Sequence, residues 1–472
     1  MQTALVYHPV LPAFAKTDEK AAGSSANHGQ IRNPQSALEE AVGLAAAIEL
    51  EVVESAVITI ARPKPATLFG TGKLDEIKGQ LSTYDHRPDL LIIDGSLTPV
   101  QHRNLEKALD IKVLDRTALI LEIFGARAQT KEGRLQVELA HLTYQRSRLV
   151  RSWTHLERQR GGDGFLGGPG ERQIESDRRV LADKIVRLRK KLEAVKRTRS
   201  LQRAKRQRAP YPVVALVGYT NAGKSTLFNL MTQSKVQAQD LLFATLDPTM
   251  RSIILASGQQ AILSDTVGFI SDLPTQLVAS FRATLEEVLE ADIIIHVRDI
   301  AHPDSEAQRQ DVLSVLQELG IDTSIQNPDS GGRPVIEALN KIDLLEDDER
   351  FTIRAAAKLS VEPSVKNATA QDPVQVAISA VTGEGVAALS TITDSFLTAE
   401  RQSHHFKIPL DQGAARAFLH ARGEVMEENV IENTLLIDVR LSSKIKGQFE
   451  TQFAILAEER EDCAPLSRVK HH

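Results

Sequence analysis

The chain has 472 residues, of which 25% are charged and 42% are hydrophobic, and its formal net charge is −5. This length exceeds what one hydrophobic core supports, so the length alone predicts about three domains. The single cysteine, Cys463, excludes a disulfide framework and fits a reducing compartment. The N-terminus lacks a secretion signal and no stretch approaches roughly 18 uninterrupted apolar residues, so we expect a cytoplasmic protein without a membrane-spanning segment.

Residues 1–133 alternate short apolar runs with helical patterns, which predicts an α/β domain whose mostly parallel sheet is covered by helices. Residues 15–34 contain few apolar side chains and favour a long flexible loop. The sequence Phe69-Gly-Thr-Gly-Lys73 lacks the spacing of a phosphate-binding loop, so a glycine-rich turn that opens a helix is favoured over phosphate binding. The predicted strands are residues 3–7, 51–60, 89–94 and 111–114, and the predicted helices are residues 36–50, 100–109 and a segment after Gly72.

Residues 134–208 carry two apolar seams joined by a glycine-rich segment. Residues 161–170 contain six glycines, and glycine loses much backbone entropy when it is ordered. We therefore expect an antiparallel coiled-coil hairpin with a glycine-rich tip at residues 160–170. Both seams repeat every seven residues, at Leu135, Leu142, Leu149 and Leu156 and at Ile174, Leu181, Leu188 and Val195. Apolar residues at intermediate positions complete them, Leu139 and Trp153 in the first and Val180, Ile185 and Leu192 in the second.

The same region is strongly basic. From Arg146 to Arg208 there are 20 Arg and Lys against 7 Asp and Glu, an excess of 13 positive charges that leaves −18 for the rest of the chain. Such an asymmetry indicates a polyanionic partner, and Phe165 and Leu166 in the tip offer surface for unstacked bases, so we expect RNA. A solvated helical face with a flexible connector is the alternative.

Residues 209–400 again alternate strands and helices, around the sequence Gly218-Tyr-Thr-Asn-Ala-Gly-Lys-Ser225. This fits the spacing G-x-x-x-x-G-K-[ST] of a phosphate-binding loop and lies between an apolar run and a helical pattern, as such a loop requires. Glycines let backbone N–H groups surround the phosphates, Lys224 reaches the β- and γ-phosphates, and the Ser225 hydroxyl ligates Mg²⁺. The loop indicates a nucleoside triphosphate.

Three later motifs select the base and sense the γ-phosphate. Asp265-Thr-Val-Gly268 ends a strand, which places Asp265 near Mg²⁺ and the Gly268 amide near the γ-phosphate. Asn340-Lys-Ile-Asp343 resembles the guanine-reading motif N-K-x-D of the Ras-like superfamily. Such a motif selects guanine because the carboxylate of Asp343 can accept hydrogen bonds that guanine donates and adenine cannot. Ser379-Ala-Val381 lies at the position of the last base-contacting loop of that superfamily. We infer GTP and GDP, with Mg²⁺, and not ATP.

Phe269 follows Gly268 at the position where Ras-like enzymes that orient water with a side chain have Gln. A phenyl ring cannot orient water by hydrogen bonding. We therefore expect slow intrinsic hydrolysis that a partner accelerates by ordering the switches or supplying a group.

The pattern of residues 401–472 predicts a small α+β domain, and we identify no set of catalytic residues in it. A docking role and a stabilising role remain alternatives for it. Its predicted strands are residues 406–410, 424–430 and 434–440, and its predicted helices are residues 412–421 and 443–453.

The motifs together resemble the HflX family of translational GTPases, in the branch that also contains Obg. The resemblance covers about residues 1 to 400 and includes the switch sequence Phe243-Ala-Thr-Leu-Asp247, which favours Thr245 over Thr249 as the switch threonine. Arg172 departs from the family pattern, which has Thr at that place. The other matching segments are Gly218 to Asn229, Asp265 to Ile270, Gly168 to Glu171, Gln173 to Glu175, Asp115 to Thr117 and Gln136 to Ala140.

The resemblance implies a Ras-like P-loop GTPase that binds the large ribosomal subunit and its RNA through the hairpin from Arg146 to Arg208 and separates stalled or idle ribosomes. It also implies that the hairpin tip lies near the peptidyl transferase centre and that the N-terminal part can bind ATP. Two alternatives remain, an RNA-remodelling protein gated by nucleotide and a ribosome assembly GTPase. We expect a monomer.

The predicted catalytic residues are Lys224, Thr245 and Gly268, and the predicted Mg²⁺ ligands are Ser225 and Thr245. The predicted nucleotide-binding residues are Gly218, Tyr219, Thr220, Asn221, Ala222, Gly223, Lys224, Ser225, Thr226, Phe243, Ala244, Thr245, Leu246, Asp247, Asp265, Thr266, Val267, Gly268, Asn340, Lys341, Ile342, Asp343, Ser379, Ala380 and Val381.

Overall fold

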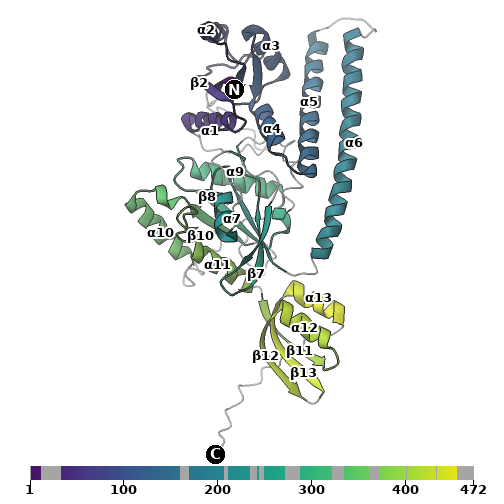
Figure 1. Cartoon of the computed structure of the whole chain (residues 1–472). Coiled ribbons are helices and arrows are strands. Elements are labelled where there is room, and N and C mark those ends of the chain that lie inside the picture. The colour runs from purple at the N-terminus through teal and green to yellow at the C-terminus, as the bar shows by residue number, and fades with distance from the viewer. Residues whose placement is uncertain are drawn as a thin grey trace, which may run out of the picture.

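In a computed structural model of the chain, three sheets follow one another, and two long helices lie between the first and the second in sequence (Figure 1). Residues 15–32 of the predicted loop, residues 160–168 of the predicted tip, Thr245 and Cys463 lie outside the residues that the structure describes. The described residues are 2–11, 33–159, 169–206, 211–233, 242–243, 249–271, 287–321, 334–361, 373–399, 401–431 and 433–453.

The first sheet has four strands in the order β2-β1-β3-β4, and all of its pairs are parallel, as predicted. Its middle strands β1 and β3 are buried and largely apolar because helices cover both faces of the sheet, whereas the edge strand β2 carries exposed polar residues. The elements are β1 (Thr3–Val10), α1 (Pro34–Ala46), β2 (Glu51–Thr59), α2 (Thr71–Leu81), β3 (Leu90–Ile93), α3 (Pro99–Leu109), β4 (Lys112–Asp115) and α4 (Arg116–Arg127).

Local signals fix where these helices begin and end. Asn33 caps α1 by accepting a hydrogen bond from the Gln35 amide, and Thr98 and Gln101 form a capping box at the start of α3. The predicted helix 36–50 ends earlier, at Ala46, because Glu49 adopts a left-handed backbone with a φ of 61° and turns the chain into β2.

The hairpin consists of α5 (Lys131–Gln159) and α6 (Pro169–Arg206), which run side by side (Figure 1). Buried Leu139 packs with three apolar residues of α6, which confirms the seam in this part of the hairpin. Leu135 and Leu142 are partly buried against that cluster, whose α6 members are Ile185, Leu188 and Leu192. The side chains of Leu149, Leu156 and Ile174 lie outside what the structure describes.

Asp115, at the end of β4, fixes the hairpin to the first sheet. The Tyr144 hydroxyl on α5 donates to the Asp115 carboxylate at 2.7 Å, while the same carboxylate caps α4 by accepting from the Ala118 amide at 2.8 Å. One buried side chain therefore sets both the start of α4 and the place where α5 packs.

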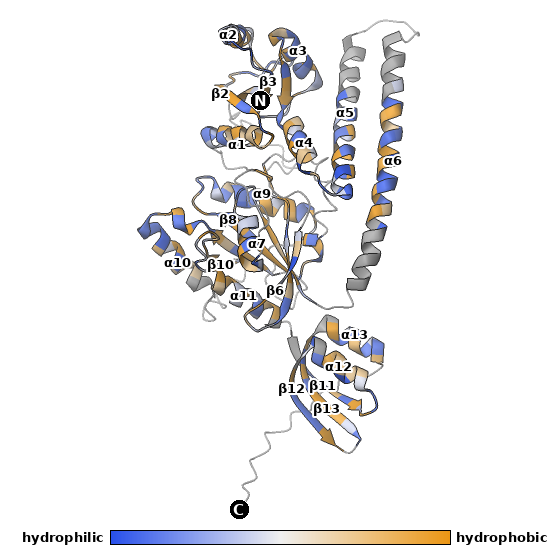
Figure 2. Cartoon of the chain, viewed as in Figure 1, coloured by the Kyte–Doolittle hydropathy of each residue, from blue (hydrophilic) through white to orange (hydrophobic). Residues whose placement is uncertain are grey.

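The second sheet has six strands in the order β10-β9-β8-β5-β7-β6, and only the described edge strand β6 is antiparallel to its neighbour. Its middle strands are apolar (Figure 2), and helices cover them. This is the predicted P-loop GTPase arrangement. The elements are β5 (Val213–Gly218), α7 (Lys224–Thr232), β6 (Thr249–Ile254), β7 (Gln260–Asp265), β8 (Ile293–Asp299), α9 (Ser305–Glu318), β9 (Val335–Asn340), the 3₁₀ turn η2 (Ile342–Leu344), α10 (Asp347–Val361), β10 (Val374–Ala377) and α11 (Val386–Ala399).

The third sheet is antiparallel, in the order β11-β13-β12, and two helices cover it, which confirms the predicted α+β class. A cluster of phenylalanine rings forms its core, and within it the ring centroids of Phe406 and Phe449 are 4.6 Å apart. No helix in the described ranges is long and apolar enough to cross a membrane. The elements are β11 (Arg401–Pro409), α12 (Gly413–Arg422), β12 (Glu424–Ile431), β13 (Thr434–Ser442) and α13 (Ser443–Phe453).

Candidate nucleotide-binding site

The phosphate-binding loop runs from the end of β5 to the start of α7, as predicted. A Cβ atom on Gly218 would lie 2.2 Å from the carbonyl oxygen of Val297 on β8. Gly223 has a φ of 93°, and a Cβ atom there would lie 2.2 Å from Asn340 Nδ2. Both glycines are therefore required for the loop to pack against its neighbours, in addition to their predicted role of leaving N–H groups accessible to phosphate.

Lys224 is the first residue of α7, and its ammonium group donates to the Tyr219 carbonyl at 2.7 Å. The side chain is buried, so the ammonium group lies along the loop instead of extending into solvent. Burial lowers the pKa of Lys224 to about 8, against the opposing effect of the Asp265 carboxylate. The negative charge of a bound phosphate group would favour the protonated form of Lys224.

We expect nucleotide affinity to weaken above pH 8. Lys224 is predicted to pair with phosphate in its protonated form, and with a pKa of about 8 in the free protein this form becomes scarce as the pH rises. The Kd for GDP should rise about tenfold between pH 7 and pH 9, with proton uptake on binding at the higher pH. Isothermal titration in two buffers of different ionisation enthalpy measures both quantities. Equal Kd values without proton uptake would contradict this expectation.

The D-x-x-G segment lies against the phosphate-binding loop. The Thr220 amide donates to the Phe269 carbonyl at 2.8 Å, and the Phe269 amide donates to the Gly218 carbonyl at 3.1 Å. A Cβ atom on Gly268 would lie 3.0 Å from Lys224 Nζ. The predicted γ-phosphate sensor and the predicted catalytic lysine are thus neighbours.

Ser225 and Asp265 also meet at this junction. The Ser225 hydroxyl donates to Asp265 Oδ2 at 2.7 Å, and Asp265 is fully buried. Because its proton is directed to the carboxylate, the Ser225 oxygen keeps lone pairs for a cation, so the residues present fit Mg²⁺. The Thr266 hydroxyl donates to the Leu216 carbonyl at 2.6 Å and holds the segment on β5.

Asn340 joins the base-reading segments. Its side chain donates to the Ala222 carbonyl at 2.8 Å and accepts from the Ala380 amide at 2.9 Å, so one residue connects the phosphate-binding loop, the N-K-x-D segment and the loop at residues 379–381. Lys341 donates to Asp299 at 2.7 Å, which fixes the start of the 3₁₀ turn.

Asp343 has a buried Oδ1 atom with no hydrogen-bond partner among the residues that the structure describes. A buried carboxylate oxygen without a protein donor fits a ligand that donates, and guanine offers the N1–H and N2 amino groups. Val381 is 77% exposed beside this region. The two predicted base-contacting segments, residues 340–343 and 379–381, therefore lie together and are joined by the Asn340 side chain.

Two predicted nucleotide-binding residues direct their side chains elsewhere. The Tyr219 hydroxyl donates to Glu40 Oε2 on α1 at 2.6 Å, and the Phe243 ring packs edge-on against Phe124 on α4 at 4.7 Å. Membership of a motif predicts a position in the chain but not a side-chain direction. Residues 244–248, with the predicted switch threonine Thr245, lie outside the described residues.

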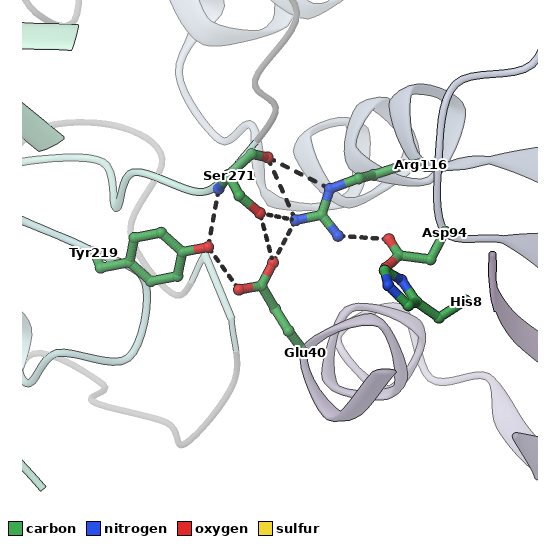
Figure 3. A network of polar contacts seen from close by, with 6 residues as sticks. All are labelled: His8, Glu40, Asp94, Arg116, Tyr219 and Ser271. Atoms are coloured by element: carbon green, nitrogen blue, oxygen red, sulfur yellow. Dashed lines mark hydrogen bonds and ion pairs between the residues drawn. The ribbon is translucent and has the colours of Figure 1, made fainter. Parts of the chain in front are cut away.

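Sequence reasoning did not identify Glu40, Arg116 and Ser271 as neighbours of the site. Arg116 on α4 and Glu40 on α1 contact Ser271, three residues after Gly268 (Figure 3). The only signal was the sequence Asp115-Arg-Thr117, which resembles the HflX family but does not say what Arg116 contacts.

Three family models match successive parts of the chain. Residues 35–125 match the GTP-binding GTPase N-terminal model, residues 127–206 match the GTP-binding GTPase middle region, and residues 213–341 match the 50S ribosome-binding GTPase model. Among solved structures, a GTP-binding protein from Sulfolobus solfataricus in complex with GDP is 24% identical, with a TM-score of 0.44, and the alignment covers 84% of this chain and 99% of that chain.

Curated relatives match over most of their length. The GTPase HflX of Magnetococcus marinus is 45% identical over 416 residues, which are 88% of this chain and 90% of the relative. The GTPase HflX of Escherichia coli (strain K12) is 40% identical over 86% of this chain and 89% of the relative. The chain is therefore a GTP hydrolase and belongs to the HflX family of GTPases.

Proposed function

We propose that this GTPase binds the large ribosomal subunit in the cytoplasm and splits stalled or idle ribosomes, and that GTP hydrolysis times its release. The observation that carries the proposal is the combination of a guanine-nucleotide site with a long basic hairpin on the same chain. The match of residues 213–341 to a model described as a 50S ribosome-binding GTPase supports it.

The hairpin is suited to RNA because its apolar seam is narrow. Ile185, Leu188 and Leu192 are buried, while the basic side chains between and beside them are exposed. Their charges can meet phosphates without losing helix packing. The exposed basic residues in this part of α6 are Lys184, Arg187, Arg189, Lys190 and Lys191.

The nucleotide site supports a GTP-dependent switch. Ser225, with Thr245, is proposed to hold Mg²⁺, which when bound neutralises charge on the β- and γ-phosphates. Lys224 contacts the same phosphates, and the Gly268 amide contacts the γ-phosphate, which GDP lacks. Loss of that contact on hydrolysis would release the segment that follows Gly268 and so weaken the ribosome-bound conformation.

We expect purified chain with GTP, or with a non-hydrolysable analogue, to convert monosomes into subunits on a sucrose gradient. A variant lacking residues 161–170 should bind GTP with unchanged affinity and leave the monosome peak intact, because it lacks the tip that reaches the RNA. A variant lacking residues 463–472 is the control of matched length.

An unchanged monosome peak with the full chain would reject the splitting function. Splitting by the variant without residues 161–170 would show that the tip is only a connector. Separation of RNA duplexes by the full chain, without any change in the monosome peak, would favour an RNA-remodelling function instead.

A further inference from the structure

A polar network joins the region of the first sheet to the two loops of the GTPase sheet that are predicted to contact phosphate (Figure 3). In Figure 3 the Arg116 guanidinium lies between Asp94 and Ser271, and Glu40 reaches toward both Ser271 and Tyr219. The residues that take part are His8, Glu40, Asp94, Arg116, Tyr219 and Ser271.

Ser271 is held through both its backbone and its side chain. Its amide donates to the Tyr219 hydroxyl at 2.9 Å. Arg116 Nη2 donates to the Ser271 hydroxyl at 2.8 Å, and the guanidinium also contacts the Ser271 carbonyl at 3.4 Å. The Ser271 hydroxyl in turn donates to Glu40 Oε1 at 3.3 Å. These hydrogen bonds together fix the position of Ser271.

The charges in this network are buried and mutually paired. Arg116 is 6% exposed, forms an ion pair with Glu40 and donates to Asp94 Oδ1 at 2.5 Å. Burial alone would lower the pKa of Arg116, but the Asp94 and Glu40 carboxylates raise it. Burial would raise the pKa of Asp94, but the hydrogen bond from His8 and the charge of Arg116 lower it. Removing Arg116 would take the guanidinium countercharge from both carboxylates, so the arrangement is strongly fixed.

The network is two short steps from Lys224 and Gly268, the residues predicted to contact the phosphates. Tyr219, whose hydroxyl binds Glu40 and Ser271, accepts the Lys224 ammonium on its carbonyl at 2.7 Å. On the other side, Ser271 lies three residues after Gly268, whose hypothetical Cβ would be 3.0 Å from Lys224 Nζ. Together with the hydrogen bonds of the Phe269 backbone to Gly218 and Thr220, the contact between Ser271 and Tyr219 holds the Gly268 amide beside the lysine.

We propose that Arg116, which lies outside the GTPase sheet, is a positioning residue for GTP hydrolysis. With Glu40 it holds Ser271 and the Tyr219 hydroxyl so that the Gly268 amide faces the γ-phosphate beside Lys224. The inference depends on GTPase chemistry and not on ribosome binding. Because GDP has no γ-phosphate, the network stabilises the GTP-bound site more than the GDP-bound site.

The substitution Arg116→Lys keeps a positive charge but cannot contact Asp94, Glu40 and Ser271 together. We expect single-turnover GTP hydrolysis by the chain alone to fall by about tenfold to a hundredfold, because small displacements of positioned groups have effects of this size. Affinity for a non-hydrolysable GTP analogue should fall about tenfold, while affinity for GDP changes by less than about twofold. Arg87→Lys is the matched control, since Arg87 is surface-exposed and pairs with Asp110 away from the site.

Tyr219→Phe provides a second variant in which no charge is removed and the loop backbone is retained. It should lower analogue affinity and hydrolysis in the same direction as Arg116→Lys, again with little change for GDP. Equal losses of GDP and analogue affinity, together with a lower melting temperature, would assign the network a merely structural role. Unchanged hydrolysis and an unchanged ratio of the two affinities in Tyr219→Phe would overturn the proposal even if Arg116→Lys does not fold.

Discussion

The substitution Asp343→Asn is expected to change the preferred base from guanine to xanthine. Asp343 Oδ1 is buried and has no protein partner in the described part of the chain, so it is placed to accept from guanine. An amide at this position presents a donor, which matches the C2 carbonyl of xanthine. Loss of two hydrogen bonds to a charged group should weaken GTP binding by roughly 10² to 10⁴-fold. Competition of GDP and XDP against a fluorescent nucleotide measures the change.

Asp348→Asn is the control for this experiment. Asp348 lies in the first turn of α10 and is exposed, so the same carboxylate-to-amide change there should leave the preference for GDP intact. If Asp343→Asn bound GDP as tightly as the unsubstituted chain, the assignment of the base to Asp343 would be wrong.

The second large effect concerns the rate of hydrolysis. Phe269 is only 4% exposed, and its backbone is paired with Gly218 and Thr220, so the residue after Gly268 is packed into the core. Neither its chemistry nor its position allows it to orient a water molecule. We expect saturating large ribosomal subunits to raise the single-turnover rate by on the order of 10³ to 10⁵-fold, as groups supplied in this way do in other GTPases.

Much of the fold was predictable because local signals agreed with one another. In the last sheet, the predicted strand 424–430 and helix 443–453 correspond to β12 and α13 within one residue. Apolar runs separated by turn residues suffice for such elements. The seam around Leu139 was predictable for the same reason, since a seven-residue repeat specifies which faces of two helices meet.

The nucleotide motifs also predicted which segments would meet. The spacing of the phosphate-binding loop and of D-x-x-G placed Lys224 and Gly268 at one site, and the structure brings them together. The sequence did not predict why residue 223 must be glycine. A Cβ atom on Gly223 would clash with the Asn340 side chain, and Asn340 is distant in sequence. Motif spacing encodes local backbone geometry, whereas packing partners are set by the whole sheet.

The contact between Arg116 and Ser271 had no sequence signal of its own. Glu40, Arg116 and Ser271 are far apart in the chain, and charged residues on helices usually face solvent. No periodicity marks a long-range polar contact, so only the relative placement of the two sheets reveals it. Tyr219 and Phe243 illustrate the same limit, since their side chains turn toward helices of the N-terminal region.

Dependence of the GTPase on the large ribosomal subunit can be measured by single-turnover hydrolysis of GTP by the chain alone, with large ribosomal subunits and with small subunits. We predict slow turnover alone and with small subunits, and acceleration on the order of 10³-fold or more with large subunits. Turnover that is as fast alone as with saturating large subunits would contradict this prediction.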